Sequence, residues 1–298
     1  MLKSPKNLGV IHFIGIGGIG MSGIAEILFQ SGYNVQGSDI NNSNNTIRLR
    51  KLGIKVFIGQ KKSNIIDAKI IVVSTAISEI NKEYVAAKKM FLPIVHRAEM
   101  LGELMRLKQS IAIAGTHGKT TTTSLIAKMI EENGMDPTII NGGIISSLDS
   151  NAKLGNGEWM VVEADESDGS FAKLNPTVAI ITNIDLEHLD FHKSEENLEK
   201  AFFQFVSSIP FYGFVCLCID HPRTQKLISK LQNKKVITYG LSANADIRAT
   251  NISYKDNKMS FLLNMSNLKK HNNKNYKIEF SMIGLHNIQN ALATIAIG

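Results

Sequence analysis

Residues 111–120 read Ile111-Ala112-Ile113-Ala114-Gly115-Thr116-His117-Gly118-Lys119-Thr120. A short apolar run enters a glycine-bearing loop, and a helical pattern follows over residues 120–133 before Gly134. A loop between a strand and a helix presents backbone N–H groups at the positive end of the helix dipole, where anions bind. The stretch therefore predicts a phosphate site in an α/β domain. Lys119 would reach the outer phosphates, and the Thr120 hydroxyl would be available to Mg²⁺.

Acidic residues follow the next buried-strand candidate, residues 159–162. They form the run Glu163-Ala164-Asp165-Glu166-Ser167-Asp168, with four acids in six residues. Buried together, these carboxylates would repel one another, so they must face water or be offset by a cation. A phosphate loop that carries Mg²⁺ usually has a carboxylate on a neighbouring strand. This favours a metal role over an acidic surface turn.

Another strand candidate, residues 178–181, leads into the polar segment 182–190, which contains His188. At the carboxyl edge of a parallel sheet and flanked by acids, His188 is a candidate Mg²⁺ or phosphate contact, although a structural role is equally open. Chemistry alone gives no functional signal for three other histidines: His117, His192 and His221.

A second glycine loop, Gly15 to Gly20, follows an apolar run at residues 10–14. It fits G-x-G-x-x-G, with Asp39 about 20 residues further on. By itself this pattern predicts a dinucleotide site, which keeps NAD open as a ligand. It indicates that a diphosphate or a similar anion fits, and does not identify the nucleotide.

Strands alternate with helices around both loops, which predicts an α/β fold. We expect an N-terminal Rossmann-like parallel-sheet domain at 1–107 and a P-loop α/β ATPase domain at 108–298, with residues 108–110 as the linker. Residues 246–280 alternate between apolar and polar around a polar stretch at 266–275, which indicates an antiparallel extension.

The composition narrows the function classes. Lys and Arg total 33 against 26 for Asp and Glu, a net charge of +7. These basic residues are scattered, so we expect no nucleic-acid partner. Cys216 and Cys218 lie in an apolar run and are expected to be reduced core residues. The sequence shows no secretory signal and no apolar stretch of about 20 residues, so we expect a cytosolic location without membrane insertion.

Together these segments resemble the Mur ligase family, and within it the branch that adds alanine. The likeness rests mainly on residues 12–25 and on the phosphate loop at 114–123, and it covers nearly the whole chain in order. A departure supports this branch: sister ligases use a carbamylated lysine, and here the corresponding helix has Lys200 only beside it. The further matching segments are 37–39, 74–77, 96–101, 163–171, 182–190, 210–213 and 284–287.

The resemblance implies an ATP-dependent ligase of peptidoglycan synthesis in the bacterial cytoplasm. The first domain would bind UDP-N-acetylmuramic acid, and the second would bind ATP. The implied UDP-sugar contacts are Gly15, Gly17, Gly18, Gly20, Ser38, Asp39, Ser74, Thr75, His96 and Arg97. The implied ATP contacts are Gly115, Thr116, His117, Gly118, Lys119, Thr120, Thr121, Asn183, His286, Asn287 and Asn290.

The resemblance also implies the chemistry. Lys119, Glu163 and His188 would be catalytic, and Thr120 and Glu163 would hold one Mg²⁺ and His188 a second. The lactyl carboxylate of the sugar would attack the γ-phosphate of ATP, and the amine of L-alanine would then attack the resulting acyl phosphate. Such catalysis is mainly electrostatic and requires no side-chain nucleophile.

The family has a third domain, which we expect this chain to lack, since it stops inside the helix that Asn287 opens. We therefore expect it to bind nucleotide without completing ligation alone. Three alternatives stay open. One is a sister ligase that attaches a preformed tripeptide to the same sugar nucleotide. Another is an NAD-dependent dehydrogenase, which rests on the first glycine loop and Asp39 alone, and the third is a non-catalytic nucleotide-binding module.

Overall fold

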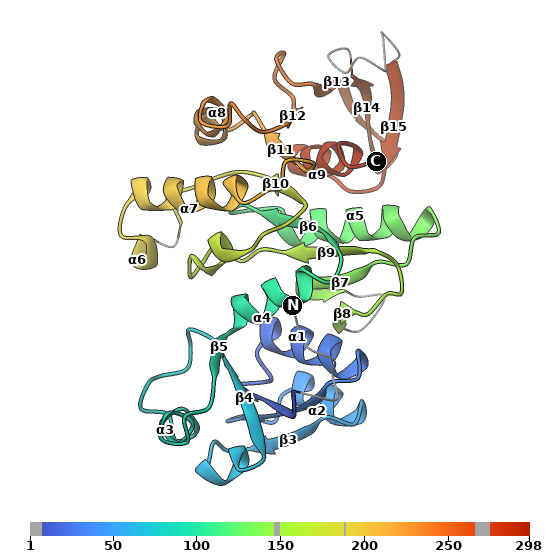
Figure 1. Cartoon of the computed structure of the whole chain (residues 1–298). Helices are drawn as coiled ribbons and strands as arrows, with labels where there is room; N and C mark the ends of the chain where they lie inside the picture. The colour runs from blue at the N-terminus through green and yellow to red at the C-terminus, as the bar shows by residue number, and fades with distance from the viewer. Residues whose placement is uncertain (1–7, 146–149, 188, 266–274) are drawn as a thin grey trace. The chain divides into compact units, whose positions relative to one another are not determined.

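The computed structural model describes residues 8–145, 150–187, 189–265 and 275–298 (Figure 1). The chain divides into two compact units. Unit 1 contains the residues up to 109 together with 136–160, and unit 2 contains 110–135 and 161–298. Residues 136–160, which follow the helix of the phosphate loop at 114–123 and precede the acidic run at 163–168, therefore belong with the first unit.

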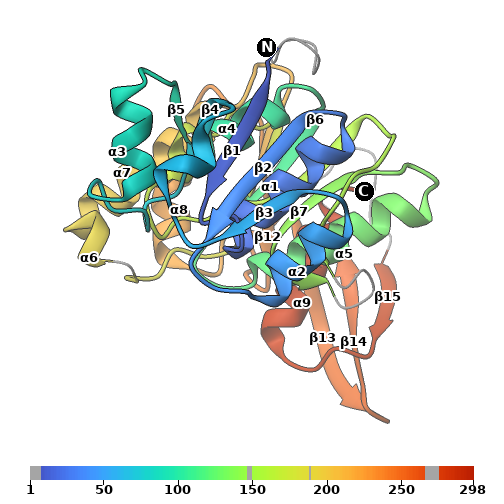
Figure 2. The ribbon, with the colours of Figure 1, turned by 90° about the horizontal axis from the view of Figure 1, so that it is seen from below.

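Unit 1 is built on a five-stranded parallel sheet with the order β3-β2-β1-β4-β5 (Figure 2). This is the strand order of a Rossmann-like sheet, whose ligands bind at the carboxyl ends of the strands where the order reverses. The reversal lies between β1 and β4. The strands are β1 Val10–Ile14, β2 Asn34–Asp39, β3 Lys55–Ile58, β4 Ala68–Val73 and β5 Ile94–His96.

Helices α2 and α3 of unit 1 start at capping side chains. The Ser43 side chain accepts a hydrogen bond from the Thr46 amide at the start of α2, and Asn81 accepts from the amides of Glu83 and Tyr84 at the start of α3. Such caps satisfy amides that lack an intrahelical partner. The helices are α1 Ile19–Gln30, α2 Asn44–Lys51, η2 Lys62–Ile65, α3 Lys82–Lys89 and α4 Arg97–Met105.

An antiparallel pair, β7 (Thr138–Ile145) and β8 (Ser150–Lys153), packs against α1 within unit 1. Arg48 of α2 joins them, because its guanidinium contacts both Glu26 of α1 and the Ser150 hydroxyl. It also lies 3.0 Å from the Asn151 side-chain oxygen. These hydrogen bonds of Ser150 and Asn151, together with the packing of both strands on α1, connect the segment to unit 1.

Unit 2 contains neighbouring strands in the order β15-β14-β13-β12-β11-β10-β6-β9. Strands β6, β10, β11 and β12 pair in parallel, while β13, β14 and β15 pair antiparallel. The predicted α/β fold and its antiparallel extension are confirmed. The strands are β6 Gln109–Ala114, β9 Trp159–Glu163, β10 Val178–Ile181, β11 Phe214–Cys218, β12 Val236–Gly240, β13 Ile247–Lys255, β14 Lys258–Asn264 and β15 Asn275–Phe280.

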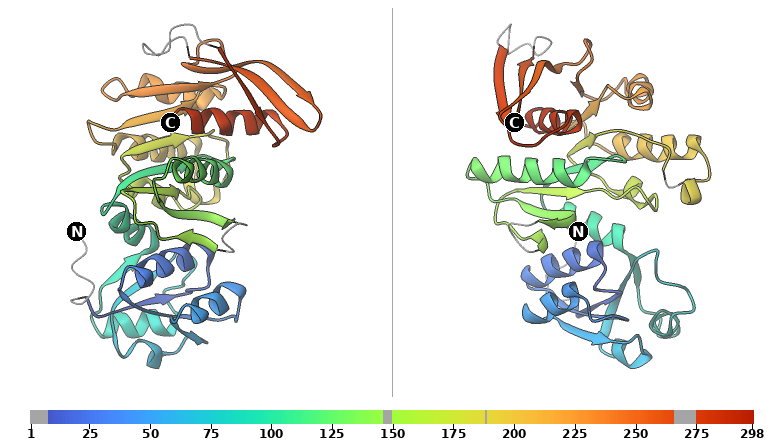
Figure 3. Two further views of the ribbon diagram at one scale, coloured as in Figure 1. Left: turned by 90° about the vertical axis from the view of Figure 1, so that its right-hand side faces the viewer. Right: turned by 180° about the vertical axis from the view of Figure 1, so that it is seen from behind.

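Helices α5 and α9 of unit 2 contact one another, and α9 also packs against β11, β12 and β13 (Figure 3). This contact brings the last described helix to the phosphate loop, from which α5 starts. The helices are α5 Lys119–Glu132, η3 Ser170–Lys173, α6 Leu189–His192, α7 Glu195–Ser207, α8 Pro222–Ser229 and α9 Leu285–Ile295.

Two local expectations have different outcomes. Gln109 and Ser110 are not linker residues, because they begin β6 and the Gln109 amide donates to the Glu158 carbonyl at 2.9 Å. The cysteines are confirmed as free and buried, and burial raises the pKa of the Cys218 thiol to about 12. Within the described ranges, no helix combines the length and apolar character needed to cross a membrane.

Candidate functional site

The phosphate loop of unit 2 joins the end of β6 to the start of α5. Its two glycines have backbone angles that favour glycine, with φ of +133° at Gly115 and +83° at Gly118. A Cβ at Gly115 would lie 2.1 Å from the Thr182 hydroxyl and 2.9 Å from the Asn183 carbonyl oxygen. Only glycine therefore lets the loop fold closely against the residues that follow β10.

Asn183 fixes the phosphate loop from the neighbouring strand. Its Oδ1 accepts from the His117 amide at 2.8 Å, and its Nδ2 donates to the His117 carbonyl at 3.0 Å. The Thr182 hydroxyl donates to the same carbonyl at 2.6 Å. The structure thus places Asn183 beside the loop, where the sequence predicts it.

Lys119 lies across the phosphate loop. Its Nζ donates to the carbonyl oxygens of Gly115 and Thr116 at 2.6 and 3.1 Å, and it lies 3.0 Å from Glu166 Oε1. Burial raises the pKa of the Glu166 carboxyl, and the nearby Lys119 charge opposes that effect. Lys119 is therefore the cation that offsets the buried member of the acidic run. Sequence reasoning left this partner unidentified.

Thr120 and Glu163 provide adjacent oxygen atoms at the start of α5 and the end of β9. The Thr120 hydroxyl donates to Glu163 Oε2 at 2.9 Å. Hydroxyl and carboxylate oxygens suit Mg²⁺, which usually keeps several waters and takes phosphate oxygens as ligands. No group of three or more acidic, His or Cys side chains is arranged for a metal among the residues the structure describes. His188 lies outside them.

Helix α9 contributes Asn290 to the loop. Asn290 is buried, and its Oδ1 accepts from the Thr122 hydroxyl at 3.1 Å. A Cβ at Gly118 would lie 2.6 Å from the same oxygen. Asn287, half-buried, accepts from Asn290 Nδ2 at 3.3 Å, whereas His286 is exposed. Of these three predicted contacts, Asn290 lies directly against the loop.

Histidines and one aspartate surround the outer side of the loop. Asp185 donates its amide to the Thr116 hydroxyl at 2.8 Å, and its carboxylate lies 2.9 Å from His221 Nε2 and 3.7 Å from His117 Nε2. His192 instead is buried against the Glu166 carbonyl at 2.9 Å. Sequence reasoning missed Asp185 and His221 as neighbours of the loop. Their positions at the ends of β10 and β11 were the available signal.

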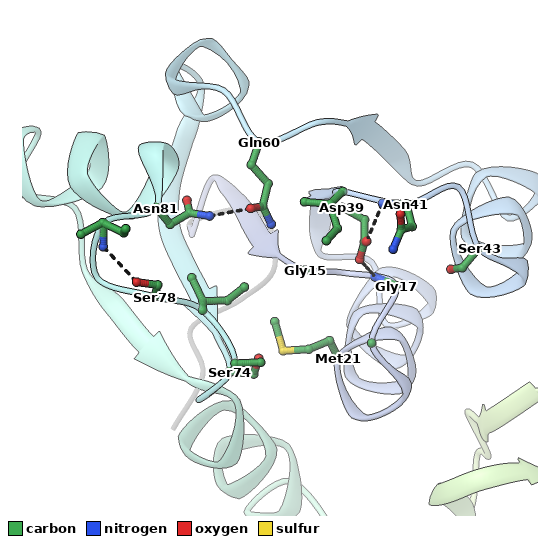
Figure 4. Close-up of a pocket in the computed structure, with 15 residues that line it drawn as sticks. Gly15, Gly17, Met21, Asp39, Asn41, Ser43, Gln60, Ser74, Ser78 and Asn81 are labelled. Carbon is green, nitrogen blue, oxygen red and sulfur yellow. Dashed lines mark hydrogen bonds between the residues drawn. The ribbon is translucent and has the colours of Figure 1, made fainter.

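Unit 1 contains a cavity of about 540 Å³ at the first glycine loop (Figure 4). Among the described residues that line it, Asp39 is the one with a charged side chain. From the predicted set, Gly15, Gly17, Gly18, Asp39 and Ser74 line this pocket. The further lining residues are Met21, Ile40, Asn41, Ser43, Gln60, Ala76, Ile77, Ser78, Ile80 and Asn81.

The Asp39 carboxylate holds the first glycine loop in place. Its Oδ2 accepts from the Gly17 amide at 2.8 Å, and its Oδ1 accepts from the Asn41 amide at 3.1 Å (Figure 4). A Cβ at Gly17 would lie 2.8 Å from this carboxylate. Gly17 and Asp39, which are 22 positions apart in the sequence, are thus hydrogen-bond partners.

The other predicted UDP-sugar residues lie off the pocket surface. Ser38 is fully buried, and Arg97 lies against Gly20, where a Cβ would come within 2.5 Å of its guanidinium. His96 caps α4 in a capping box with Glu99, and Thr75 is exposed. Gln60, Ser78 and Asn81 were missed by sequence reasoning, although a helix-capping Asn after a strand was a signal for Asn81.

Comparison with protein families matches both halves of the chain. Residues 10–109 match the description "Mur ligase family, catalytic domain", and residues 113–298 match "Mur ligase middle domain". The second match covers more than half of the 298 residues.

Named relatives extend the comparison over the whole chain. A UDP-N-acetylmuramate–L-alanine ligase of Rhodospirillum rubrum is 53% identical over 298 residues, all of this chain and 62% of the relative. The enzyme of the same name from Acidiphilium cryptum is 54% identical, again over 62% of its length. The chain therefore spans about 62% of the length of these curated relatives.

Solved structures agree in fold. A UDP-N-acetylmuramate-alanine ligase of Thermotoga maritima has a TM-score of 0.84 and 31% identity, covering 97% of this chain and 64% of that one. A UDP-N-acetylmuramate:L-alanyl-gamma-D-glutamyl-meso-diaminopimelate ligase of Neisseria meningitides has a TM-score of 0.86 and 25% identity, covering 97% and 92%.

Proposed function

Because this chain belongs to the Mur ligase family, we propose that it supplies the nucleotide-binding parts of an ATP-dependent ligase. The reaction joins L-alanine to the lactyl carboxylate of UDP-N-acetylmuramic acid. The names of relatives that are 53% and 54% identical support alanine over a tripeptide, since the tripeptide-type ligase of Neisseria is 25% identical. The observation that carries the proposal is the contact between Thr120 and Glu163 beside Lys119.

The chemistry starts from an unreactive carboxylate, which has no good leaving group. Its oxygen attacks the γ-phosphorus of ATP, the bond to the β-phosphate oxygen breaks, and ADP leaves with both electrons. The amine of L-alanine then attacks the carbonyl carbon of the acyl phosphate, inorganic phosphate leaves, and the amine loses a proton. Phosphoryl transfer of this kind depends on positioning and on charge stabilisation more than on covalent catalysis.

The side chains of the phosphate loop divide these tasks. Lys119 would exchange its contact with Glu166 for the phosphates and so offset their negative charge. The amides at the start of α5 would bind phosphate oxygens, and Asn183 keeps the loop in the required shape. No nucleophilic side chain takes part.

A Mg²⁺ ion fits the oxygen pair of Thr120 and Glu163, which lie 2.9 Å apart. When bound there, the ion supplies positive charge against the β- and γ-phosphates and orients them. We retain His188 as the proposed ligand of a second Mg²⁺.

The pocket of unit 1 is proposed to hold the uridine diphosphate part of the sugar nucleotide. Its volume of about 540 Å³ suits a small-molecule ligand. In a dinucleotide site, the acidic residue after β2 accepts from a ribose hydroxyl. Here the Gly17 and Asn41 amides each donate to one Asp39 oxygen, and both oxygens keep acceptor capacity, so a titration with NADH is the control that separates the two ligands.

Calorimetric titration of UDP-N-acetylmuramic acid into the purified chain tests the proposal, with NADH as the matched control. Saturable binding of the sugar nucleotide, and none of NADH, is the expected result. Binding of NADH alone would contradict it.

A further inference from the structure

A buried carboxylate lies behind the wall of the pocket in unit 1. Glu83, the second residue of α3, is fully buried. Its Oε2 accepts from the Ser38 hydroxyl and from His12 Nε2, the latter at 3.3 Å. Its Oε1 accepts from Asn64 Nδ2 at 2.6 Å and from the Lys61 amide at 3.2 Å. A buried carboxylate is tolerated as an anion when donors surround it in this way.

The hydrogen on the His12 ring is located by its second neighbour, Gln36. Gln36 Nε2 donates to the Asn64 carbonyl at 2.8 Å and lies 3.2 Å from His12 Nδ1. The Gln36 amide cannot be turned, because its oxygen would then face the Asn64 carbonyl oxygen. His12 Nδ1 therefore accepts, and Nε2 carries the hydrogen that points to Glu83. All four groups that contact the carboxylate are thus hydrogen-bond donors.

Two partners of Glu83 adjoin residues that line the pocket. Ser38 directly precedes Asp39, which holds the first glycine loop, and Lys61 directly follows Gln60. A shift of either partner would move its pocket-lining neighbour, because consecutive Cα atoms are held about 3.8 Å apart. The carboxylate therefore connects β2 to the segment after β3.

The start of α3 completes the connection. Asn81 lines the pocket, caps the helix by accepting from the Glu83 amide at 2.9 Å, and donates to Gln60 Oε1 at 2.5 Å (Figure 4). Glu83 is consequently fixed through its backbone to one wall of the pocket and through its side chain to two others.

We propose that Glu83 is a positioning residue for the sugar nucleotide, acting through Asp39, Gln60 and Asn81. This inference rests on the proposed function of the pocket. By accepting from four donors, one carboxylate holds the three segments at the separation that the uridine diphosphate part requires. It never touches the ligand.

Substitution at Glu83 separates charge from shape. Glu83→Gln keeps the shape, but either orientation of its amide turns N–H groups toward donors. Glu83→Asp keeps two acceptor oxygens and shortens the side chain. We expect the Kd for UDP-N-acetylmuramic acid to rise at least about tenfold in Glu83→Gln and by less in Glu83→Asp. A role limited to filling space predicts the opposite order.

Two controls accompany the titrations. Glu103→Gln makes the same change at an ion pair with Arg106 on the surface of unit 1, and its Kd should equal that of the unchanged chain. ADP binding to unit 2 should be equal in every variant, so a parallel loss of ADP affinity would indicate general unfolding and overturn the inference. Hydrogen exchange at the Lys61 amide should accelerate in Glu83→Ala, which removes both acceptor oxygens, while exchange at Phe13 in β1 should not.

The outcomes are distinct. Equal sugar-nucleotide affinity in Glu83→Gln and the unchanged chain, or unchanged exchange at Lys61 in Glu83→Ala, overturns the role of Glu83 and leaves the proposed function standing. If the unchanged chain itself binds no UDP-N-acetylmuramic acid, the proposed function of the pocket fails, and the inference fails with it.

Discussion

The two glycine loops of this chain have the same backbone plan and different surroundings. Each joins a parallel strand to the N-terminus of a helix, α1 in unit 1 and α5 in unit 2. In the first loop, the Gly17 amide is engaged by the carboxylate of Asp39. In the second, Lys119 lies across the loop, and the Thr120 hydroxyl contacts Glu163.

The difference shows that the backbone of a strand, a glycine loop and a helix N-terminus binds an anion, while the neighbouring side chains decide whether the bound phosphate can react. Residues 15–20 contain no cation, and the Arg97 guanidinium lies against Gly20 at the end of the first loop, so this loop can hold a diphosphate. The second loop adds a lysine, a hydroxyl and a carboxylate, which are the groups that offset phosphate charge and hold Mg²⁺. We therefore expect the two loops to respond differently to equivalent changes.

The largest expected difference concerns the first glycine of each loop. Gly115→Ala combines a φ of +133° with a Cβ 2.1 Å from the Thr182 hydroxyl, whereas Gly15→Ala has a φ of +78° and meets only the end of Ile77 at 3.2 Å. We expect Gly115→Ala to lower the free energy of unfolding by about 3–5 kcal/mol, since strain and overpacking add. Gly15→Ala should lower it by about 1–2 kcal/mol, from strain alone. Urea denaturation followed by circular dichroism measures both.

Gly134→Ala is the control for strain without contact, because Gly134 has a φ of +74° and no atom lies within 4 Å of its Cβ position. It should lower the free energy of unfolding by about as much as Gly15→Ala does. If Gly115→Ala were no more destabilising than these two variants, the close fit of the second loop against Thr182 and Asn183 would be wrong.

A smaller effect is expected when the cation of the second loop is removed. Lys119→Ala should weaken ATP binding roughly 10- to 100-fold, the loss of hydrogen bonds from a charged group. Binding of the sugar nucleotide should not change, since the lysine belongs to unit 2 alone. Calorimetric titration with each nucleotide gives both values.

Lys128→Ala on the same helix is the matched control, because Lys128 pairs with Glu132 on the exposed face of α5. It should bind ATP as the unchanged chain does. Equal loss of ATP affinity in the Lys119 and Lys128 variants would show that the second loop has no special cation.

Asp39→Asn is the counterpart in the first loop. It should weaken binding of the sugar nucleotide and leave binding of ATP unchanged.

The local plan of both loops could be predicted from sequence because it depends on neighbours in the chain. A strand, glycines and a helix in succession fix the loop geometry, and a carboxylate at the end of the next strand must approach it. Thr120 and Glu163 accordingly lie together as expected. The antiparallel extension after β12 was predictable for the same reason, since alternation along β14 is a local pattern.

Contacts that depend on distant residues could not be predicted. The acidic run offered four candidates, and only the folded chain shows that Glu166 is buried against Lys119. His12 and Glu83 are separated by 71 positions. Residues 136–160 belong to unit 1 because β7 and β8 pack on α1 and contact Arg48, partners that lie far away in the sequence.

The smallest expected effect is a change of the free energy of unfolding with pH, which comes from the pair of Glu166 and Lys119. Burial raises the folded-state pKa of Glu166 above its ordinary value of 4.5, despite the opposing charge of Lys119. The folded state then binds the proton more tightly than the unfolded state. The stability from this group is complete below the ordinary pKa and is lost as the pH rises through the raised one.

Without nucleotide, the free energy of unfolding of the unchanged chain minus that of Glu166→Gln should therefore fall as the pH rises from 4.5. Urea titrations at a series of pH values measure this difference. Glu132→Gln is the control of opposite sign, because the hydrogen bond from Lys128 lowers the pKa of Glu132 and its stability is lost as the pH falls. A difference for Glu166 that rises with pH would mean that Lys119 outweighs burial. The second loop would then hold its lysine in a strong resting ion pair, which ATP would have to break.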